Sequence, residues 1–206
     1  MDYGLLSPIS NILLDDIKLS HSQTIGRKLI IHTLGSKPSL DGVDLAIIGV
    51  VESRNSVEYI DQKYNLNEIR KYFYSLYPGN WLCKIADLGD VKNGDKAEDT
   101  YKSVTSIVSD LLKNNIIPVI IGGSQDITYA NYRAYDNIKP MINIVNVDKS
   151  FDLGDSSKPI TNLSYIGKVI LEKPYNLFNY TSIGFQTYFN SQEEIDLMEK
   201  LYFEYE

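Results

Sequence analysis

The stretch NIVNVDKSFDLGD, residues 143–155, runs from an apolar strand into three polar side chains spaced two residues apart: Asp148, Ser150 and Asp152. Successive side chains of a strand alternate between its two faces. We therefore expect these three on one side, as far as strand geometry persists, with Phe151 pointing away. Two carboxylates there could hold one loosely bound Mg²⁺ or Ca²⁺, since those cations accept oxygen ligands. The alternative is that they cap the loop and form local salt bridges.

A second predicted strand also runs from apolar residues into polar ones at its end. The segment NNIIPVIIGGSQD, residues 114–126, is an apolar run closed by Gly122 and Gly123. Two glycines allow a sharp backbone turn, after which Ser124, Gln125 or Asp126 would begin a helix. Ser124 also stands in a Gly-x-Ser-x-Asp context that faintly resembles a nucleophile elbow. A helix N-cap is the favoured interpretation, because no histidine follows it in the chain to act as a base.

Apolar strands alternate with helical patterns along most of the chain, which predicts βαβ units. Further strands are expected at 44–50, 82–90 and 179–185. The helix over 65–77 should bury Leu66, Ile69, Phe73 and Leu76, which recur at helical spacing. The predicted fold class is α/β, a three-layer α/β/α arrangement with a mainly parallel sheet. Ligands of such sheets bind at the carboxyl ends of the strands.

Two further helices have clear signals. The segment from 101 to 112 carries a stripe formed by Tyr101, Val104, Ile107, Val108, Leu111 and Leu112. Near the end of the chain, Ser191 and Glu194 have the spacing of a capping box ahead of an apolar helical pattern.

Composition excludes several classes of function. The 27 acidic and 20 basic residues give a net charge of −7, which disfavours nucleic acid as a partner. No stretch approaches the roughly 20 apolar residues that span a bilayer, so no membrane partner is expected. The single cysteine, Cys83, cannot form an internal disulfide, and we expect a buried, inert thiol in a cytoplasmic protein.

The two motifs together resemble those of the ureohydrolase family that includes arginase, agmatinase and formimidoylglutamase. That family carries Gly-Gly-Asp-His at one strand end and Asp-Ala-His-x-Asp at the next, where this chain has GGSQ (122–125) and DKSFD (148–152). The segments NEIRKYFYSLY (67–77) and TSIGFQTYFNSQEEIDLMEKLYFEYE (181–206) are also similar to the family. The resemblance covers roughly 41–206 and leans towards formimidoylglutamase.

The resemblance implies a fold and a chemistry. We expect residues 41–206 to be the N-terminal part of an arginase-like α/β domain, incomplete at its C-terminus, preceded by an extension of uncertain structure over 1–40. Family members hold two manganese ions that activate a hydroxide to attack a guanidinium or amidine carbon. Their six ligands are one histidine from the first motif, Asp, His and Asp from the second, and two aspartates from a later Asp-x-Asp motif.

This chain departs from the family pattern at the metal ligands. Gln125 and Ser150 stand at the two histidine positions, and only Asp148 and Asp152 are kept, as vestigial metal ligands. An amide or hydroxyl oxygen is a weaker ligand for a transition metal than imidazole. The two histidines of the chain, His21 and His32, lie outside both motifs. We expect them to be surface or hydrogen-bonded side chains.

The leading hypothesis is a domain that has lost its metal centre and its hydrolytic activity. It would act as a pseudoenzyme, a binding domain or a scaffold, with no cofactor and with no catalytic residue assigned. Its partner would be a protein or a small guanidino- or amidine-like ligand, and a homo-oligomer stays open. The alternative is an active hydrolase of linear amidines or guanidino compounds, with Mn²⁺ at an altered site completed beyond Glu206.

Overall fold

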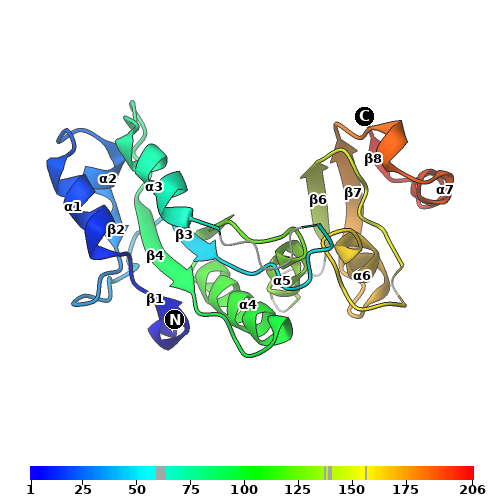
Figure 1. The fold of residues 1–206 in the computed structure, drawn as a ribbon, viewed down its shortest axis with the longest axis horizontal. Coiled ribbons are helices and arrows are strands. Elements are labelled where there is room, and N and C mark those ends of the chain that lie inside the picture. Colours follow the sequence, from blue (N-terminus) through cyan, green and yellow to red (C-terminus); the bar gives the residue numbers. More distant parts are fainter. Residues whose placement is uncertain (59–63, 137, 139–140, 156) are drawn as a thin grey trace. The chain divides into compact units, whose positions relative to one another are not determined.

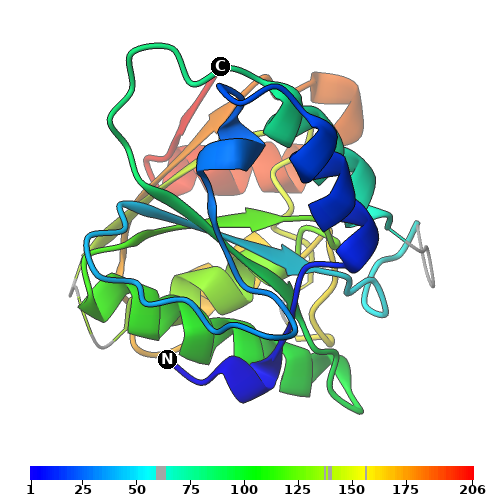
Figure 2. The ribbon, with the colours of Figure 1, turned by 90° about the vertical axis from the view of Figure 1, so that its left-hand side faces the viewer.

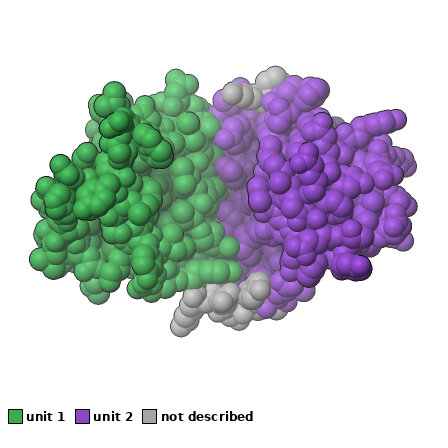
Figure 3. Space-filling model, turned by 90° about the horizontal axis from the view of Figure 1, so that it is seen from above, with its two compact units in different colours: residues 1–52, 61–123 green, residues 53–60, 124–206 purple. Residues whose placement is uncertain are grey.

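The computed structural model describes residues 1–58, 64–136, 138, 141–155 and 157–206 (Figure 1). These form two compact units, coloured separately in Figure 3. Unit 1 comprises residues 1–52 and 61–123, and unit 2 comprises residues 53–60 and 124–206. Each unit is described by itself below.

Unit 1 is built on a mainly parallel sheet whose strands follow the order β1-β4-β3-β5, with β2 also paired to β4. Its strands are β1 (Leu6–Ser7), β2 (Ile30–Ile31), β3 (Leu45–Val50), β4 (Ile85–Val91) and β5 (Ile117–Ile121). The central strand β3 pairs in parallel with both β4 and β5, and β1 is antiparallel to β4. Because β3 lies between two strands and two helical layers, five of its six residues are buried: Ala46, Ile47, Ile48, Gly49 and Val50.

Helices cover both faces of this sheet (Figure 2). They are α1 (Asn11–Leu19), α2 (Ile25–Lys28), α3 (Leu66–Ser75) and α4 (Ala97–Lys113), and a short 3₁₀ helix, η1 (Tyr3–Leu5), precedes β1. The α4 helix lies on one face, with α1 and α3 on the other. The stripe predicted for α4 is confirmed for Tyr101, Val104, Ile107, Val108 and Leu111, which are buried, whereas Leu112 is half-buried.

The predicted buried face of α3 was wrong in part. The buried residues are Leu66, Arg70 and Tyr74, whereas Ile69 and Leu76 are about half exposed. The reason is a buried ion pair: Arg70 Nε donates to Asp87 Oδ2 on β4 over 2.9 Å, and the Tyr74 hydroxyl donates to the same oxygen over 2.7 Å. Because Arg70 and Tyr74 both bind Asp87 of β4, α3 is oriented with Arg70, rather than Ile69, towards the sheet.

Residues 1–40 contribute η1, β1, α1, α2 and β2 to unit 1. Within this segment His32 is buried, and its Nδ1 lies 2.9 Å from the carbonyl oxygen of Leu88, as expected of a hydrogen-bonded histidine. The exposed His21 stacks edge-on against Tyr77.

The expectation of a buried Cys83 was wrong, because this thiol is exposed. It belongs to a loop in which Trp81 and Leu82 are also exposed, and β4 begins two residues later. The apolar residues from Leu82 onwards predict an earlier start of the strand, but pairing with β3 begins only at the register Leu45–Ile85.

Unit 2 is built on a second parallel sheet in the order β6-β7-β8. Its elements are α5 (Ile127–Arg133), β6 (Ile142–Val147), α6 (Tyr165–Leu171), β7 (Leu177–Ile183), η2 (Thr187–Phe189), α7 (Gln192–Lys200) and β8 (Glu204–Tyr205). Its core is formed by Phe151, Leu153, Tyr165, Ile166, Tyr180 and Met198. The predicted capping box of α7 is confirmed: Glu194 N–H donates to Ser191 Oγ over 3.2 Å, and Ser191 N–H donates to Glu194 Oε2 over 3.0 Å.

The predicted α/β class is confirmed, with parallel strands alternating with helices in both units. Among the described residues no helix is long and apolar enough to cross a membrane.

Candidate functional site

The candidate site lies in unit 2, immediately after β6. Asp148 follows the last strand residue and remains bonded to the sheet, because its backbone N–H donates to the Ile183 carbonyl over 3.0 Å. Beyond it the chain turns. The Asp148 Oδ1 atom accepts the backbone N–H groups of Lys149 and Ser150, over 2.6 and 3.4 Å. Asp148 thus caps its own loop, which is the simpler of the two roles expected for it.

Strand alternation does not persist through this loop as far as Asp152. Asp152 has a φ of 55°, in the left-handed region, and Phe151 is fully buried in the unit 2 core. Ser150 links the two carboxylates: its backbone N–H faces Asp148, and its hydroxyl donates to Asp152 Oδ1 over 2.8 Å. The three predicted residues do lie together, but a turn brings them together rather than one face of a strand.

Gln125 reaches the same group from the turn that precedes α5. Its side-chain amide Nε2 donates a hydrogen bond to Asp148 Oδ2. The amide is exposed, and its orientation is assigned from this hydrogen bond. The structure therefore brings together all four of the residues singled out by the two motifs, with Gln125 and Ser150 each donating to one of the two aspartates.

Asp152 is the most perturbed acid of the site. Its side chain is only 2% exposed, and this burial is the main reason that its pKa is raised to about 7. The Ser150 hydrogen bond lowers the pKa, and the charge of Asp148 raises it. The second carboxyl oxygen, Oδ2, is buried and has no hydrogen bond of normal geometry among the described residues, although the nearby Tyr165 hydroxyl also lowers the pKa of Asp152. A buried carboxyl oxygen in this state favours the protonated acid or calls for a donor or cation beside it.

Residues that the sequence motifs did not reveal hold this loop in place. Asn190 Oδ1 accepts the Phe151 N–H over 2.8 Å, and Asn190 Nδ2 donates to the Lys149 carbonyl over 2.9 Å. The Tyr180 hydroxyl donates to the Phe151 carbonyl over 3.2 Å, and burial raises the pKa of Tyr180 to about 12. The nearby capping box marks where α7 starts, but no sequence signal indicates that Asn190 contacts the loop.

Ser124 does not cap α5 as predicted. The N-cap position belongs to Asp126, and the Ser124 hydroxyl donates to the Asp126 carboxylate instead. Both side chains are buried. The hydroxyl is therefore committed to a neighbouring acid rather than to the end of the helix.

The donor set does not fit a binuclear manganese centre. In the part of the chain that the structure describes, no group of three or more His, Cys, Asp or Glu side chains is placed to hold a metal ion. Two of the four site residues are neutral, and both turn a hydrogen towards a carboxylate. Each carboxylate already accepts at least one hydrogen bond, and Asp148 and Asp152 are the two charged ligands that these motifs offer.

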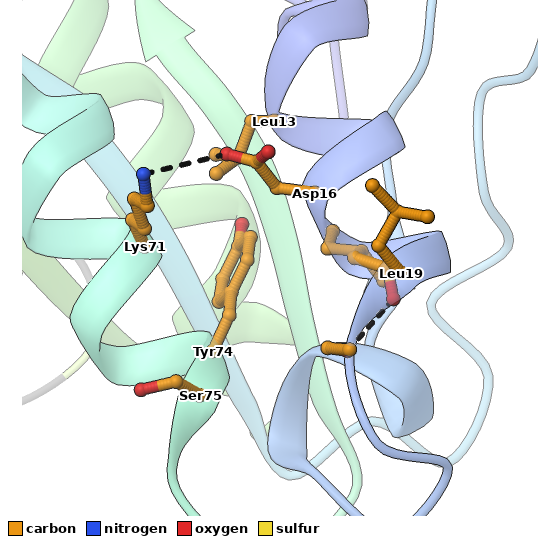
Figure 4. Close-up of a pocket in the computed structure, with 8 residues that line it drawn as sticks. Leu13, Asp16, Leu19, Lys71, Tyr74 and Ser75 are labelled. Carbon is orange, nitrogen blue, oxygen red and sulfur yellow. Dashed lines mark hydrogen bonds and ion pairs between the residues drawn. The ribbon is translucent and has the colours of Figure 1, made fainter.

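A separate cavity of about 250 Å³ lies in unit 1 between α1 and α3 (Figure 4). Its wall is mainly apolar, from Leu13, Ile17 and Leu19, with Lys71 Nζ 3.9 Å from Asp16 Oδ2 at one side. The Tyr74 hydroxyl points past the cavity to the buried Asp87. This hollow offers one partly exposed ion pair and no candidate catalytic group.

Comparison with known proteins places the site in context. The model of the arginase family matches residues 43–205. The formimidoylglutamase of Staphylococcus carnosus is 27% identical over 195 residues, which cover 93% of this chain and 61% of that protein. The formimidoylglutamase of Macrococcus caseolyticus is 27% identical over 165 residues, covering 76% of this chain and 51% of that protein. The chain thus spans about three fifths or less of these relatives.

Solved structures share the fold at low sequence identity. The formimidoylglutamase of Bacillus subtilis has a TM-score of 0.72 and 17% identity, covering 83% of this chain and 57% of that one. The formiminoglutamase of Trypanosoma cruzi, solved with Mn²⁺, also has a TM-score of 0.72 and 17% identity, covering 88% of this chain and 64% of that one.

Proposed function

The chain belongs to the arginase family, and from this premise we propose that it is a formimidoylglutamase-like member without the binuclear manganese site and without hydrolytic activity. Its role would be that of a binding or scaffold domain. The observation that carries the proposal is the hydrogen bond from the Gln125 amide to the Asp148 carboxylate. A side chain that presents N–H to a carboxylate offers no lone pair to a cation at that point.

The second histidine position supports the same proposal. A metal-bound histidine presents a ring nitrogen lone pair, whereas Ser150 presents a hydroxyl that donates to Asp152. The two neutral donors thus each engage one oxygen of an aspartate, Oδ2 of Asp148 and Oδ1 of Asp152. Serine and glutamine are also weak ligands for manganese-type ions compared with imidazole.

The chemistry of the site indicates what it would bind. Asp148 is half-buried, whereas Asp152 is buried, so Asp148 is the carboxylate within reach of a ligand. Guanidinium and amidinium groups donate paired N–H groups to carboxylates, which suits a small guanidino- or amidine-like ligand. A basic side chain of a partner protein would present the same group.

Metal titration tests the loss of the site. Calorimetric titration of Mn²⁺ into the purified chain at pH 8, where Asp152 is ionised, should give no stoichiometric binding tighter than about 1 mM. The Asp148→Asn/Asp152→Asn variant serves as the matched baseline. Two equivalents of Mn²⁺ bound at micromolar affinity or tighter, and lost in that variant, would overturn the proposal.

An active hydrolase is the second candidate, and the buried Oδ2 of Asp152, which has no hydrogen bond of normal geometry among the described residues, is the observation that favours it. Such an enzyme would hold an altered metal site, with further ligands from the part of the family domain that this chain does not span. Release of urea, ammonia or formamide from arginine, agmatine, guanidinobutyrate or formiminoglutamate would be measured with Mn²⁺ present. Turnover that Asp152→Ala abolishes and Asp155→Ala preserves would establish this candidate.

A further inference from the structure

The cavity between α1 and α3 has one wall outside the region that the arginase family model matches. That region begins at residue 43, whereas α1 spans Asn11–Leu19. Both helices belong to unit 1, and the space between them is about 250 Å³. A dry apolar cavity of about 150 Å³ holds benzene, whereas drug-sized ligands occupy about 300 Å³ or more. The volume therefore suits a small molecule with one large apolar group.

The neutral polar groups that line the cavity are already bonded within the protein. The Ser20 and Ser75 hydroxyls each donate over 2.7 Å to the carbonyl oxygen three residues earlier in the chain. The Tyr74 hydroxyl donates over 2.7 Å to a buried carboxylate of β4, so it is not free for a ligand. In Figure 4 the ring of Tyr74 lies between the two helices, below the ion pair of Asp16 and Lys71. That pair is what the lining offers to a polar group.

Asp16 on α1 and Lys71 on α3 are the charged residues of the lining. Their ion pair is long, at 3.9 Å, and their side chains are 44% and 60% exposed. Exposed pairs of this kind contribute little to stability, because water screens the charges and both side chains lose freedom. A ligand can therefore separate the two side chains at small cost.

One acid beside one base complements a ligand that carries both charges close together. A simple anion would be repelled by Asp16, and a simple cation by Lys71. An α-amino acid has its ammonium, its carboxylate and its side chain on a single carbon. We propose that this cavity binds a free α-amino acid with a large apolar side chain. The ammonium pairs with Asp16, the carboxylate pairs with Lys71, and the side chain lies against the apolar wall: Leu13, Ile17 and the ring of Tyr74.

An NMR titration of the intact chain with L-phenylalanine tests this proposal. The amide resonances of Leu13, Ile17 and Tyr74 should shift with a dissociation constant of about 1 mM or tighter, which is what a ligand of this size reaches at the usual binding energy per atom. Three analogues each lack one recognised group: 3-phenylpropanoate the ammonium, phenethylamine the carboxylate, and L-alanine the large apolar group. Each analogue should bind at least tenfold more weakly.

Two variants locate the ligand at the ion pair. Asp16→Asn and Lys71→Met each remove one charge at a partly exposed position, so both should fold, and either should weaken L-phenylalanine binding at least tenfold. Asp15→Asn and Lys18→Met are the matched controls. They break an exposed pair of 2.8 Å on the same helix that does not line the cavity, and binding should be unchanged.

Three outcomes would overturn the proposal. The first is that no amide shifts at L-phenylalanine concentrations well above that dissociation constant. The second is equal affinity for L-phenylalanine and the two analogues that lack a charge, since the cavity would then take up any apolar molecule. The third is binding that survives both Asp16→Asn and Lys71→Met.

A further variant separates this site from the site of the proposed function. Asp148→Asn/Asp152→Asn should bind L-phenylalanine as the native chain does. Loss of binding in that variant would place the ligand at the aspartates of unit 2 and contradict the proposal for the cavity. The Mn²⁺ titration does not involve α1 or α3, so a failure of the proposed function would be recognised separately.

Discussion

The side-chain amide of Gln125, in the turn before α5, donates a hydrogen bond to Oδ2 of Asp148, the first residue after β6. Asp148 Oδ1 accepts backbone N–H groups from its own loop. Both oxygens of this carboxylate are therefore engaged by neutral donors. The four residues at the two motifs form one hydrogen-bonded group, in which Gln125 and Ser150 each donate to one aspartate.

Replacing those two side chains by histidine should create metal affinity. In Gln125→His/Ser150→His, two imidazole nitrogens would join Asp148 and Asp152, giving the mixed nitrogen and oxygen ligands that suit manganese-type ions. We expect the dissociation constant for Mn²⁺, measured by calorimetry at pH 8, to fall at least tenfold relative to the native chain.

The matched control is Gln125→Leu/Ser150→Ala, which removes the same hydrogen bonds without adding a ligand. Equal Mn²⁺ affinity in the two double variants would contradict the idea that the histidine positions limit metal binding. Thermal unfolding without metal should be compared in parallel, so that changes in folding are separated from changes in affinity.

Asp152 should make the stability of the protein fall as pH rises from about 4 to 7. Its pKa is about 7 in the folded chain, against about 3.9 in an unfolded one, so the folded state holds a proton that the unfolded state has released. The favourable contribution is complete below pH 4 and lost above pH 7. Asp152→Asn should remove this slope and raise the free energy of unfolding at pH 8 by roughly 4 kcal/mol.

Urea denaturation at pH 5 and pH 8 measures the effect as the difference between variant and native chain. Asp155→Asn is the control, because Asp155 is an exposed acid three residues away whose pKa is lowered by the Ser157 hydroxyl. If the free energy of unfolding of Asp152→Asn depends on pH in the same way as that of the native chain, Asp152 is ionised in the folded protein at pH 5.

Removing the buried cation of unit 1 should be strongly destabilising. In Arg70→Met, Asp87 keeps the Tyr74 hydroxyl and the Gly89 N–H but loses its cationic partner while remaining fully buried. Breaking one side of a buried ion pair costs about 3–5 kcal/mol. The double variant Arg70→Met/Asp87→Asn should recover part of this loss, which a urea-denaturation cycle would show as coupling between the two positions. If the stability losses of the two single variants simply add up in the double variant, the ion pair between Arg70 and Asp87 does not contribute to stability.

Asn190 should hold the loop of the candidate site. Asn190→Ala removes three hydrogen bonds, to the Phe151 N–H and to the Lys149 and Gln186 carbonyls, over 2.8 to 2.9 Å. At roughly 0.5–1.5 kcal/mol each, their loss should destabilise unit 2 by about 2–3 kcal/mol. Amide exchange of Phe151 should accelerate, whereas the equally substituted Asn176→Ala should leave it unchanged. Unaltered exchange at Phe151 in Asn190→Ala would exclude this role.

Several expectations followed from local sequence signals and were confirmed for that reason. The α4 stripe and the Ser191–Glu194 capping box depend on residues within one or two turns of helix, so spacing alone determines them. Expectations that depended on distant partners were less successful. The rotation of α3 depends on Asp87 of β4, and the exposure of Cys83 depends on where β4 begins to pair with β3.

The sequence by itself determined the α/β class and the family, because alternating strand and helix patterns and the motifs at strand ends are local signals. Only the tertiary structure decided what the side chains at those strand ends do. The burial of Asp152, the hydrogen bond from Gln125 to Asp148 and the support from Asn190 all arise from contacts between segments far apart in the chain. Desolvation and hydrogen-bond geometry depend on everything that surrounds a group, and residue spacing does not encode them.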